Sequence, residues 1–540
     1  MDCFCALEWI LNKWTIVLSI VGYFFYKWSV ATSQFFAEKG VPYHKPMPLF
    51  GNFLDIVFQK ISMADKVIEL YNQFKTKRAF GMFEMRNPML VINDPELIKQ
   101  ITIKDFDHFT ERRQFFDKNS EPLIARNLAS LTGQQWRDMR STLSPAFTGS
   151  KMRQMFELVV ESAENLVSEL MKKAKSSTEP YVVEVKDIFT LYTNDVIAST
   201  AFGLKINSIQ DNNNKFYTLG KKVMNFGGWT GIKLFFVITF PKIARMIKLK
   251  VFPSEYMDYF RNLVLDAIKY REAHDIIRPD MIQLLMQAQK GTLKLASEDS
   301  SENGTAGFAT VEEHEVGERD HHILEDDDLT AQCFVFFAAG FETSAVLSCF
   351  TAHEICANAD VQSKLIEEVD EVVKSLNGKK LSYDVIQRMK YLDMVVSETL
   401  RMWPPAIAFD RVCSKEYTFQ DFDGNNITIK KGENLSFPTI GIHRDERYYP
   451  NPSRFDPERF SDENKANINS QAYLPFGSGP RNCIGSRFAL METKALIFYL
   501  LNSFTLEVSE KTQIPIRLSK SSFKFGPQNG FWIHLKPRVK

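Results

Sequence analysis

The strongest chemical signal is a single cysteine presented by a glycine-rich loop. Residues 475–490 read PFGSGPRNCIGSRFAL and place Cys483 after a tight turn and directly before an apolar helix. A thiolate at a helix amino terminus is stabilised by free N–H groups and by the helix dipole. Arg481 adds positive charge, and Gly485 leaves the helix start bare enough for a flat ligand to approach. A lone cysteine is more often apolar filler, but these neighbours favour a functional thiolate.

The loop lacks the partner that other thiolate chemistry needs. Neither a histidine nor a second cysteine lies near Cys483 in the sequence. The chain also has no zinc-protease HExxH pair, no phosphate-binding glycine loop and no GxSxG elbow. A metal or a heme group therefore remains as the partner of the thiolate.

A second signal is an acid and a base at helical spacing. Glu398 and Arg401 lie at i and i+3, so they share one face of a helix, and FDPERF (455–460) later supplies Arg459. On a protein surface such a pair contributes only about 0.5 kcal/mol and occurs by chance in many helices. The pair carries an argument only together with the other motifs.

A third signal is a glycine inside a helical stretch, in Ala339-Gly340-Phe341-Glu342-Thr343. Glycine costs about 1 kcal/mol relative to alanine in a helix interior, so its presence needs a reason. One interpretation is that Gly340 opens room for a small ligand beside Thr343. The other is that Thr343 is a buried residue bonded to its own i−4 carbonyl.

Taken together, these segments resemble those of the cytochromes P-450, over nearly the whole chain. The cysteine loop, RPDMIQLLM (278–286) and FAAGFET (337–343) are most similar to insect microsomal members, family nine in particular. The resemblance implies a mainly α-helical fold with small β-sheets, forming one heme domain behind an amino-terminal membrane anchor. It also implies a monooxygenase that uses O2 and holds heme b through the Cys483 thiolate.

The resemblance assigns roles at matching positions. Glu398, Arg401 and Arg459 would form a buried structural triad, and Thr343 with Glu342 would deliver protons during oxygen activation. The implied heme-binding residues are Cys483, Trp136, Arg140, Arg112 (or Arg113), Arg411, Arg481 and Phe476. The expected substrate-pocket residues are Phe115, Phe116, Leu123, Phe334, Phe337, Phe341, Ala406, Ile407 and Phe409. Each pocket residue has plain core packing as its alternative.

Composition narrows the remaining classes. The 540 residues include 66 basic and 66 acidic side chains, and this zero net charge argues against a nucleic-acid binder held by bulk electrostatics. With 44% hydrophobic and 24% charged residues, wholesale disorder is excluded. The 7 cysteines form no disulfide framework, which favours a reducing compartment. The 45 phenylalanines suit an aromatic pocket for a bulky lipophilic substrate.

The amino terminus is predicted to anchor the protein in a membrane. Residues 14–36 carry one charge, Lys27, and can cross a bilayer if that lysine reaches the interface. A cleaved signal peptide is the alternative, but Asp2 and Glu8 stand where a basic region would be expected. Lysines after the apolar run favour a cytosolic body. The predicted divisions are an anchor at 1–36, a proline-rich hinge at 37–52 and the heme domain at 53–540.

Helical periodicity dominates the body, with two unusual stretches. Helices are predicted at 150–175, 185–203, 255–290, 325–358, 361–375, 383–403 and 483–503, and strands near 80–93, 416–430 and 504–537. Residues 297–328 contain twelve carboxylates and are predicted to form a solvated loop, with His321-His322 an incidental feature rather than a metal site. Residues 226–252 combine apolar residues with cations and form either a buried helix or a membrane-dipping patch.

Electrons would have to come from another protein, since no nucleotide-binding fingerprint is present. The resemblance implies an NADPH-dependent reductase in the endoplasmic reticulum membrane, with cytochrome b5 as an additional donor. Basic docking candidates are Arg137, Lys151, Arg153 and Arg487. Clearance of xenobiotics such as insecticides is the leading function, and oxidation of endogenous lipids or hormones is the alternative. A reductase-independent heme-thiolate isomerase and a heme-based gas sensor are two further hypotheses.

Overall fold

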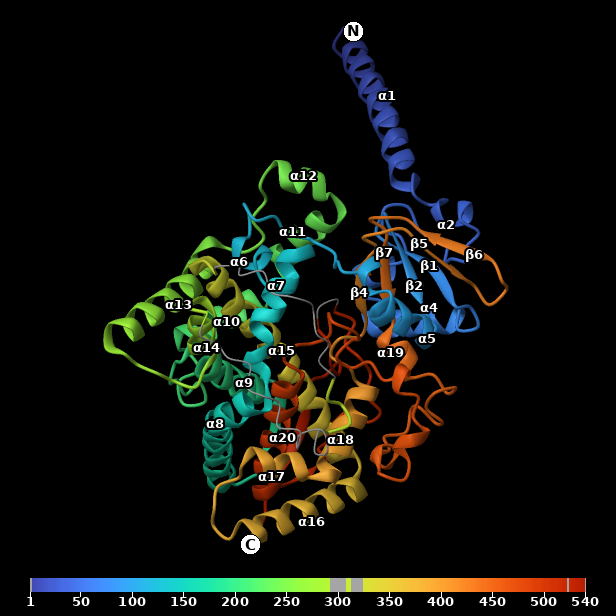
Figure 1. Cartoon of the computed structure of the whole chain (residues 1–540). Helices are drawn as coiled ribbons and strands as arrows, with labels where there is room; N and C mark the ends of the chain where they lie inside the picture. The colour runs from blue at the N-terminus through green and yellow to red at the C-terminus, as the bar shows by residue number, and fades with distance from the viewer. Residues whose placement is uncertain (1, 292–306, 312–323, 522–523, 540) are drawn as a thin grey trace.

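Helices form most of the molecule, and short strands gather in a lobe beside the helical body (Figure 1). The computed structural model describes residues 2–291, 307–311, 324–521 and 524–539, with side chains from residue 13 onward. The predicted fold, mainly helical with small sheets, is confirmed. The α-helices are α1 Asp2–Val30, α2 Phe35–Glu38, α3 Leu54–Val57, α4 Met63–Gln73, α5 Pro95–Lys99, α6 Pro122–Ala125, α7 Gly133–Leu143, α8 Gly149–Ser176, α9 Val185–Phe202, α10 Lys215–Val223, α11 Gly228–Thr239, α12 Pro241–Met246, α13 Ser254–His274, α14 Met281–Gln289, α15 Asp326–Ala357, α16 Ala359–Leu376, α17 Tyr383–Arg388, α18 Lys390–Met402, α19 Thr439–His443 and α20 Ser486–Ser503.

Three small sheets account for the strands. The strands are β1 Ala79–Glu84, β2 Asn87–Ile92, β3 Val182–Glu184, β4 Phe409–Val412, β5 Tyr417–Gln420, β6 Asn426–Ile429, β7 Asn434–Phe437, β8 Phe504–Glu507 and β9 Trp532–Pro537. They pair in the orders β1-β2-β7-β4, β3-β9-β8 and β5-β6. Among the named strands, β2 and β7 pair in parallel. The other paired strands run antiparallel. All three predicted strand regions therefore contain strand pairs or sheet edges.

Two predicted helices are each divided in two. The stretch 255–290 breaks after His274, where Asp275 adopts a left-handed conformation with φ 50° and caps α13. Asp280 then accepts a hydrogen bond from the Gln283 N–H and starts α14. The stretch 383–403 breaks at Met389, whose ψ of 95° is extended. Helical periodicity continues across both breaks, so it did not reveal them.

Helix α15 runs through the centre of the helical body. It packs most extensively against α9, and its aromatic residues join a cluster with Phe202, Phe216 and Phe260. Among the described residues it alone is long and apolar enough to cross a membrane, yet 61% of its apolar window is buried inside the protein. It is therefore a core helix, and a share of the phenylalanine surplus lies in the core around it.

The amino-terminal helix projects away from the body (Figure 1). Its described apolar side chains, Trp14 and Phe24 among them, are largely exposed. Near its end, Trp28 stacks on Phe240 with ring centroids 5.4 Å apart. Phe36 is buried where the missing side chain of Gly81 makes room for its ring. The body therefore begins before the predicted boundary at residue 36.

The predicted hinge is packed onto the sheet lobe rather than free. Val41 is buried, and Tyr43 and Gly51 form isolated bridges to Gly81 and Glu84 of β1. Lys39 pairs with Glu433 at 2.6 Å. The segment predicted as a hinge, 37–52, thus packs on the same sheet as the residues that follow it.

Most of the predicted acidic loop lies outside the described residues, including His321-His322. Its carboxyl end is helical, because α15 begins at Asp326. Glu325 and Asp328 form a capping box there, in which each side chain accepts a backbone hydrogen bond from the other end of the turn. The last four carboxylates of the run are thus the amino-terminal cap of the core helix.

Candidate active site

A cavity of about 420 Å³ lies between α15, α9, α7 and the loop that carries Cys483. The cysteine loop and the start of α20 contribute Phe476, Cys483 and Phe488 to its wall. Apart from its arginines, the lining is mostly apolar or aromatic. A cavity of this size and polarity suits a cofactor or a small organic ligand.

Two left-handed glycines shape the cysteine loop. Gly477 has φ 77° and Gly479 has φ 73°, values that other residues rarely adopt. At Gly479 a side chain would also overlap the carbonyl of Thr102. The Cys483 N–H donates to the Phe476 carbonyl at 2.9 Å, which closes the loop. The loop therefore presents the cysteine at the cavity wall, just before α20 begins at Ser486.

Opposing effects act on the Cys483 thiol. Burial raises its pKa, while a hydrogen bond from the Gly485 backbone and the charges of Arg140 and Arg112 lower it. Burial is the larger effect, so the helix start alone does not ionise the thiol, in contrast to the sequence-based expectation. A metal ion deprotonates a coordinating thiol outright. The site therefore suits a thiolate held by a metal.

Three arginines border the same cavity. Arg140 donates to the carbonyl and side-chain oxygens of Asn482 at 3.1 and 2.8 Å. Arg481 donates to the Thr110 and Leu131 carbonyls, and its guanidinium lies 4.1 Å from the Trp136 ring centroid. Burial lowers the pKa of Arg481 to about 9. Arg112 donates to the Arg481 carbonyl at 2.9 Å.

The structure distinguishes Arg112 from its neighbour Arg113. Arg112 borders the cavity, whereas Arg113 does not; Arg113 pairs with Glu84 and with Asp410, which is itself a lining residue. Arg411 is fully buried behind the loop and donates to the Ser478 carbonyl at 2.9 Å. Burial holds the pKa of Arg411 well below its usual value. Arg411 does not border the cavity within the described part of the chain.

Helix α15 faces the cavity with Phe336, Ala339, Gly340 and Thr343. The Thr343 hydroxyl donates to the Ala339 carbonyl, the i−4 bond considered in the sequence. Gly340 has a packing reason, because a Cβ there would lie 2.6 Å from Ile197 Cδ1 of α9. Both readings of the sequence thus hold in part: Thr343 bonds its own helix and also borders the cavity.

Glu342 does not border the cavity in the described structure. Its side chain is 40% exposed and pairs with Lys186 Nζ of α9 at 2.8 Å. Adjacent residues on a helix point about 100° apart, so Glu342 and Thr343 cannot share one face. The ion pair holds the Glu342 carboxylate against Lys186 of α9, while the neighbouring Thr343 side chain borders the cavity.

The expected pocket residues divide into two groups. Ala406 and Phe409 border the cavity. Phe334, Phe337 and Phe341 lie on the opposite side of α15, in the core aromatic cluster. The remaining four lie away from the lining that the described residues form. Leu123 is buried core, Phe115 lies beside Arg113, Phe116 packs near Phe252, and the Ile407 carbonyl bonds the Ile440 N–H.

Some lining residues were not anticipated from the sequence. Ile197 and Ala201 come from α9, which carries no motif. Phe336 lies four residues before Gly340, and Phe488 lies five residues after Cys483. Helical spacing from Gly340 could have found Phe336, whereas Phe488 lies in a helix that begins only at Ser486 and has no such relation to Cys483. Only the packing of α9 on α15 brings in Ile197.

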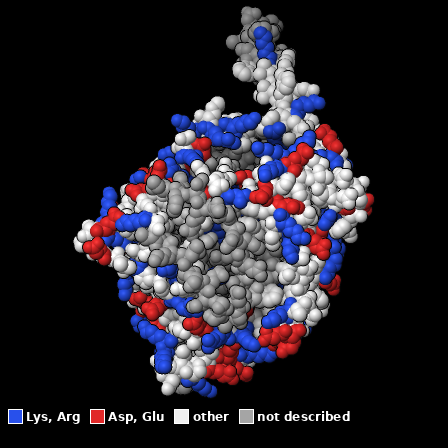
Figure 2. Space-filling model, in the orientation of Figure 1, with Lys and Arg blue, Asp and Glu red and all other residues white. Residues whose placement is uncertain are grey.

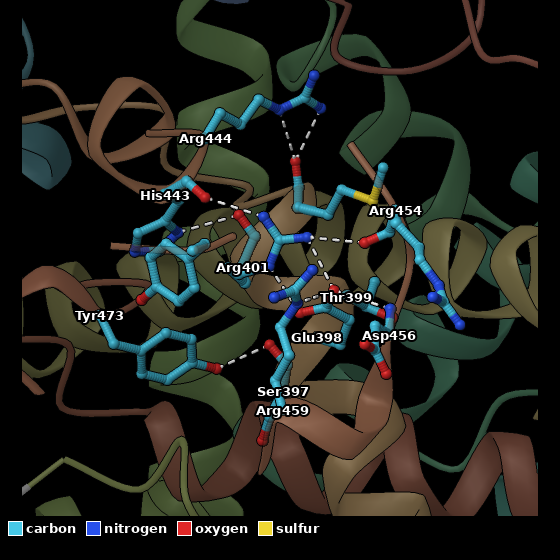
Figure 3. A network of polar contacts seen from close by, with 12 residues as sticks. Ser397, Glu398, Thr399, Arg401, His443, Arg444, Arg454, Asp456, Arg459 and Tyr473 are labelled. Atoms are coloured by element: carbon cyan, nitrogen blue, oxygen red, sulfur yellow. Dashed lines mark hydrogen bonds and ion pairs between the residues drawn. The ribbon is translucent and has the colours of Figure 1, made fainter. Parts of the chain in front are cut away.

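The triad residues meet in a buried network (Figure 3). Arg401 donates from Nε and Nη2 to the two carboxylate oxygens of Glu398 at 2.6 and 2.8 Å. Arg459, from the 3₁₀ helix η5 (Pro457–Phe460), donates to Glu398 Oε1 at 3.3 Å. Arg401 also donates to the His443 carbonyl at 2.9 Å. Glu398 and Arg401 are fully buried, so this network ties α18 to η5 and α19.

The residues around the cavity fit a heme. Cys483 supplies a thiol at the wall, and Arg112, Arg140 and Arg481 supply cations for two carboxylate groups. Within the described chain, the buried Nε atoms of Arg112 and Arg411 lack hydrogen-bond partners. A buried donor without a partner is costly, so an acceptor such as a carboxylate is expected at the Arg112 Nε atom, which belongs to a cavity-lining residue. A cysteine and several guanidiniums around one apolar cavity are the groups that a heme-thiolate site requires.

Comparison with known proteins agrees with this site. The family model described as Cytochrome P-450 matches residues 41–534. The chain is 47% identical to "Probable cytochrome P-450 9f2" of Drosophila melanogaster, over 97% of this chain and 98% of the relative. It is 43% identical to cytochrome P-450 9e2 of Blattella germanica, with the same coverage. The protein therefore belongs to the cytochrome P-450 family and is a heme-thiolate monooxygenase, most similar to insect family-nine members.

Proposed function

We propose that this protein oxidises bulky lipophilic compounds, with clearance of xenobiotics such as insecticides as its main task. The observation that carries the proposal is the cavity beside Cys483, whose wall away from the arginines is apolar and aromatic. Such a surface favours ligands through apolar burial rather than through specific polar contacts. Oxidation of endogenous lipids or hormones uses the same chemistry and remains the alternative.

We further propose that Cys483 supplies the thiolate and that Arg112, Arg140 and Arg481 hold the heme carboxylates. Arg411 would support them from behind the loop. A heme held there supplies the activation of O2, with the thiolate donating electron density that favours O–O cleavage. Charge-assisted hydrogen bonds from the arginines would orient the group and offset the cost of the buried cations.

Proton supply is assigned to α15. The Thr343 hydroxyl borders the cavity and can hold a water molecule there while it keeps its bond to Ala339. Glu342 and Lys186 stand at the partly exposed side of the same helix turn. This arrangement favours a relay in which Glu342 takes up protons and a water molecule ordered by Thr343 carries them into the cavity.

Electrons are proposed to come from NADPH through a membrane-bound flavoprotein reductase, with cytochrome b5 as an additional donor. The basic candidates are not equally available to such a partner. Arg137 pairs with Asp107 and Arg153 with Asp384. Lys151 is half-buried at the start of α8, and Arg487 donates to the Phe147 carbonyl. A docking partner would have to compete for these contacts, which makes reduction sensitive to salt.

The protein is proposed to sit on the endoplasmic reticulum membrane with its catalytic domain in the cytosol. Among the described residues α1 does not reach the length and apolarity of the buried α15, but its described apolar side chains are exposed and Lys27 lies in its last turn, so α1 would be the anchor. Beside it, α11 and α12 expose Trp229 and Met246 at 78% and 76%, which disfavours the buried-helix interpretation of 226–252. Figure 2 shows Lys and Arg side chains gathered around this end of the molecule. Apolar residues next to cations suit a lipid interface.

The deciding experiment combines a spectrum with turnover. The reduced protein should give the carbon-monoxide difference spectrum of a thiolate-ligated heme, and Cys483→Ala should lose it. A panel of lipophilic compounds should then be oxidised only when the reductase, NADPH and O2 are all present. Turnover of a peroxide without reductase would favour the isomerase, and a wild-type spectrum without the thiolate signature would overturn the proposal.

A further inference from the structure

Residues 307–311 lie in the middle of the predicted acidic loop, called the insertion below, and pack against the helical body. The Phe308 N–H donates to Asp393 Oδ2 at 2.9 Å. The Phe308 ring lies 4.8 Å from the Phe460 centroid and 5.2 Å from that of Tyr473. The next residue, Ala309, is buried. The contact joins an insertion between α14 and α15 to residues 85 to 165 positions further along the chain.

The surface that contacts residues 307–311 is complementary to them in charge and shape. One oxygen of Asp393 accepts the Phe308 N–H, and the other accepts Lys494 Nζ at 2.7 Å. The Lys494 side chain is fully buried, so its ammonium group fixes the Asp393 carboxylate from the protein interior. At Gly307 a Cβ would overlap the Asp393 carboxylate, so only glycine allows this approach. Charge, ring contacts and a required glycine thus converge on one position.

The same residues adjoin the buried Glu398 network and the chain that leads into the cysteine loop. Asp393 lies on α18, which carries Glu398 and Arg401, and Phe460 follows Arg459 in η5. Tyr473 donates to the Ser397 carbonyl at 2.9 Å and stacks on His443 at 5.5 Å. The cysteine loop starts two residues later. The docked segment therefore bridges α18, η5 and the chain that enters the loop.

We propose that residues 307–311 form an internal strap that clamps these three segments and thereby braces the cysteine loop. The claim that the strap stabilises heme ligation rests on the proposed role of Cys483. The claim that residues 307–311 dock on the body does not. Phe308 acts as a positioning residue. Its ring contacts both Phe460 and Tyr473, and its N–H donates to the Asp393 oxygen that Lys494 leaves free. Loss of the strap should loosen both the insertion and the loop.

Two variants remove the strap by different routes, with one matched control. Phe308→Ala removes the ring, and Gly307→Ala introduces a methyl group where the Asp393 carboxylate lies. Phe422→Ala is the control, because Phe422 is a 61% exposed ring next to the β5–β6 turn. In the holoenzyme, hydrogen–deuterium exchange is followed at the backbone of residues 307–311, where the Phe308 N–H is bonded to Asp393. Both strap variants should exchange there about tenfold faster or more than wild type and the control, because exchange follows the opened fraction.

Ligation supplies a second readout. After mild heating, followed by dithionite and carbon monoxide, both strap variants should lose the thiolate-specific band several-fold faster than wild type and Phe422→Ala. Unchanged exchange in both variants would overturn the strap. Faster exchange with unchanged loss of the band would overturn the bracing. Absence of the band from wild type would instead refute the proposed heme ligation, while the exchange rates still decide the docking.

Discussion

At the scale of single residues, the site depends on side chains whose neighbours change their chemistry. Burial raises the pKa of Cys483 even though it precedes a helix, and two arginines oppose that effect. Thr343 keeps a hydrogen bond to Ala339 while it borders the cavity. Glu342, one residue away, is held at the other side of the helix by Lys186. Two adjacent residues, Glu342 and Thr343, therefore lie in different environments: one in an ion pair and the other at the cavity.

Thr343→Ala should uncouple electron consumption from substrate oxidation. Without the hydroxyl, a water molecule in the cavity loses a partner that fixes it, so protons reach oxygen without control and peroxide is released. The ratio of product to NADPH should fall several-fold while peroxide rises, measured together in the reconstituted system. Thr343→Ser keeps the hydroxyl and should stay near wild type. Equal coupling in the alanine variant would contradict the assigned role.

At the scale of elements, the buried network around Glu398 connects helices that are distant in the chain. Its carboxylate accepts two bonds from Arg401, one from Arg459 and one from the Asp456 N–H. Removing one member of a buried charge network leaves the others uncompensated. The network lies close to Tyr473 and so to the start of the cysteine loop (Figure 3).

Glu398→Gln should lower the free energy of unfolding by about 3–5 kcal/mol, because Arg401 keeps its charge in a dry site without a full counter-charge. Denaturant unfolding measures the loss, and heme content should fall with it. Glu458→Gln is the matched control, since Glu458 also lies in η5 but pairs with Lys364 on the exposed surface. Its cost should stay within about 0.5 kcal/mol. Similar costs for both variants would refute a special role for the buried network.

At the scale of the whole molecule, one end combines α1, α11 and α12 (Figure 1). Trp28 stacks on Phe240 there and lies under Arg86, so α1 has a defined contact with this end of the body. Exposed apolar residues of α11 and α12 accompany it. The phenylalanine surplus is thus shared between this end, the cavity wall and the core around α15.

Trp229 should insert into lipid when the full chain is reconstituted in vesicles. It is 78% exposed on an apolar helix next to basic residues, a combination that favours the interface. The contribution of Trp229 to the fluorescence is the difference between wild type and Trp229→Phe, and brominated lipids should quench that difference. The share missing in Trp532→Phe should resist quenching, because Trp532 lies in β9 and bonds the Asn529 carbonyl. Equal quenching of the two shares would contradict membrane contact at α11.

Local spacing indicated the residues that matter most in this protein. The short glycine-rich loop singled out Cys483, and the spacing of three put Glu398 and Arg401 on one helix face, because these relations are set along one chain segment. The burial of that pair was expected only from the family resemblance. Packing decided the rest. Only the contacts of α15 with its neighbours turn Phe336 to the cavity and Phe337 to the core, only the fold separates Arg112 from Arg113, and only tertiary contact seats Phe308 beside Tyr473. Periodicity defines the faces of a helix, whereas its rotation relative to distant segments depends on how the whole core fills space.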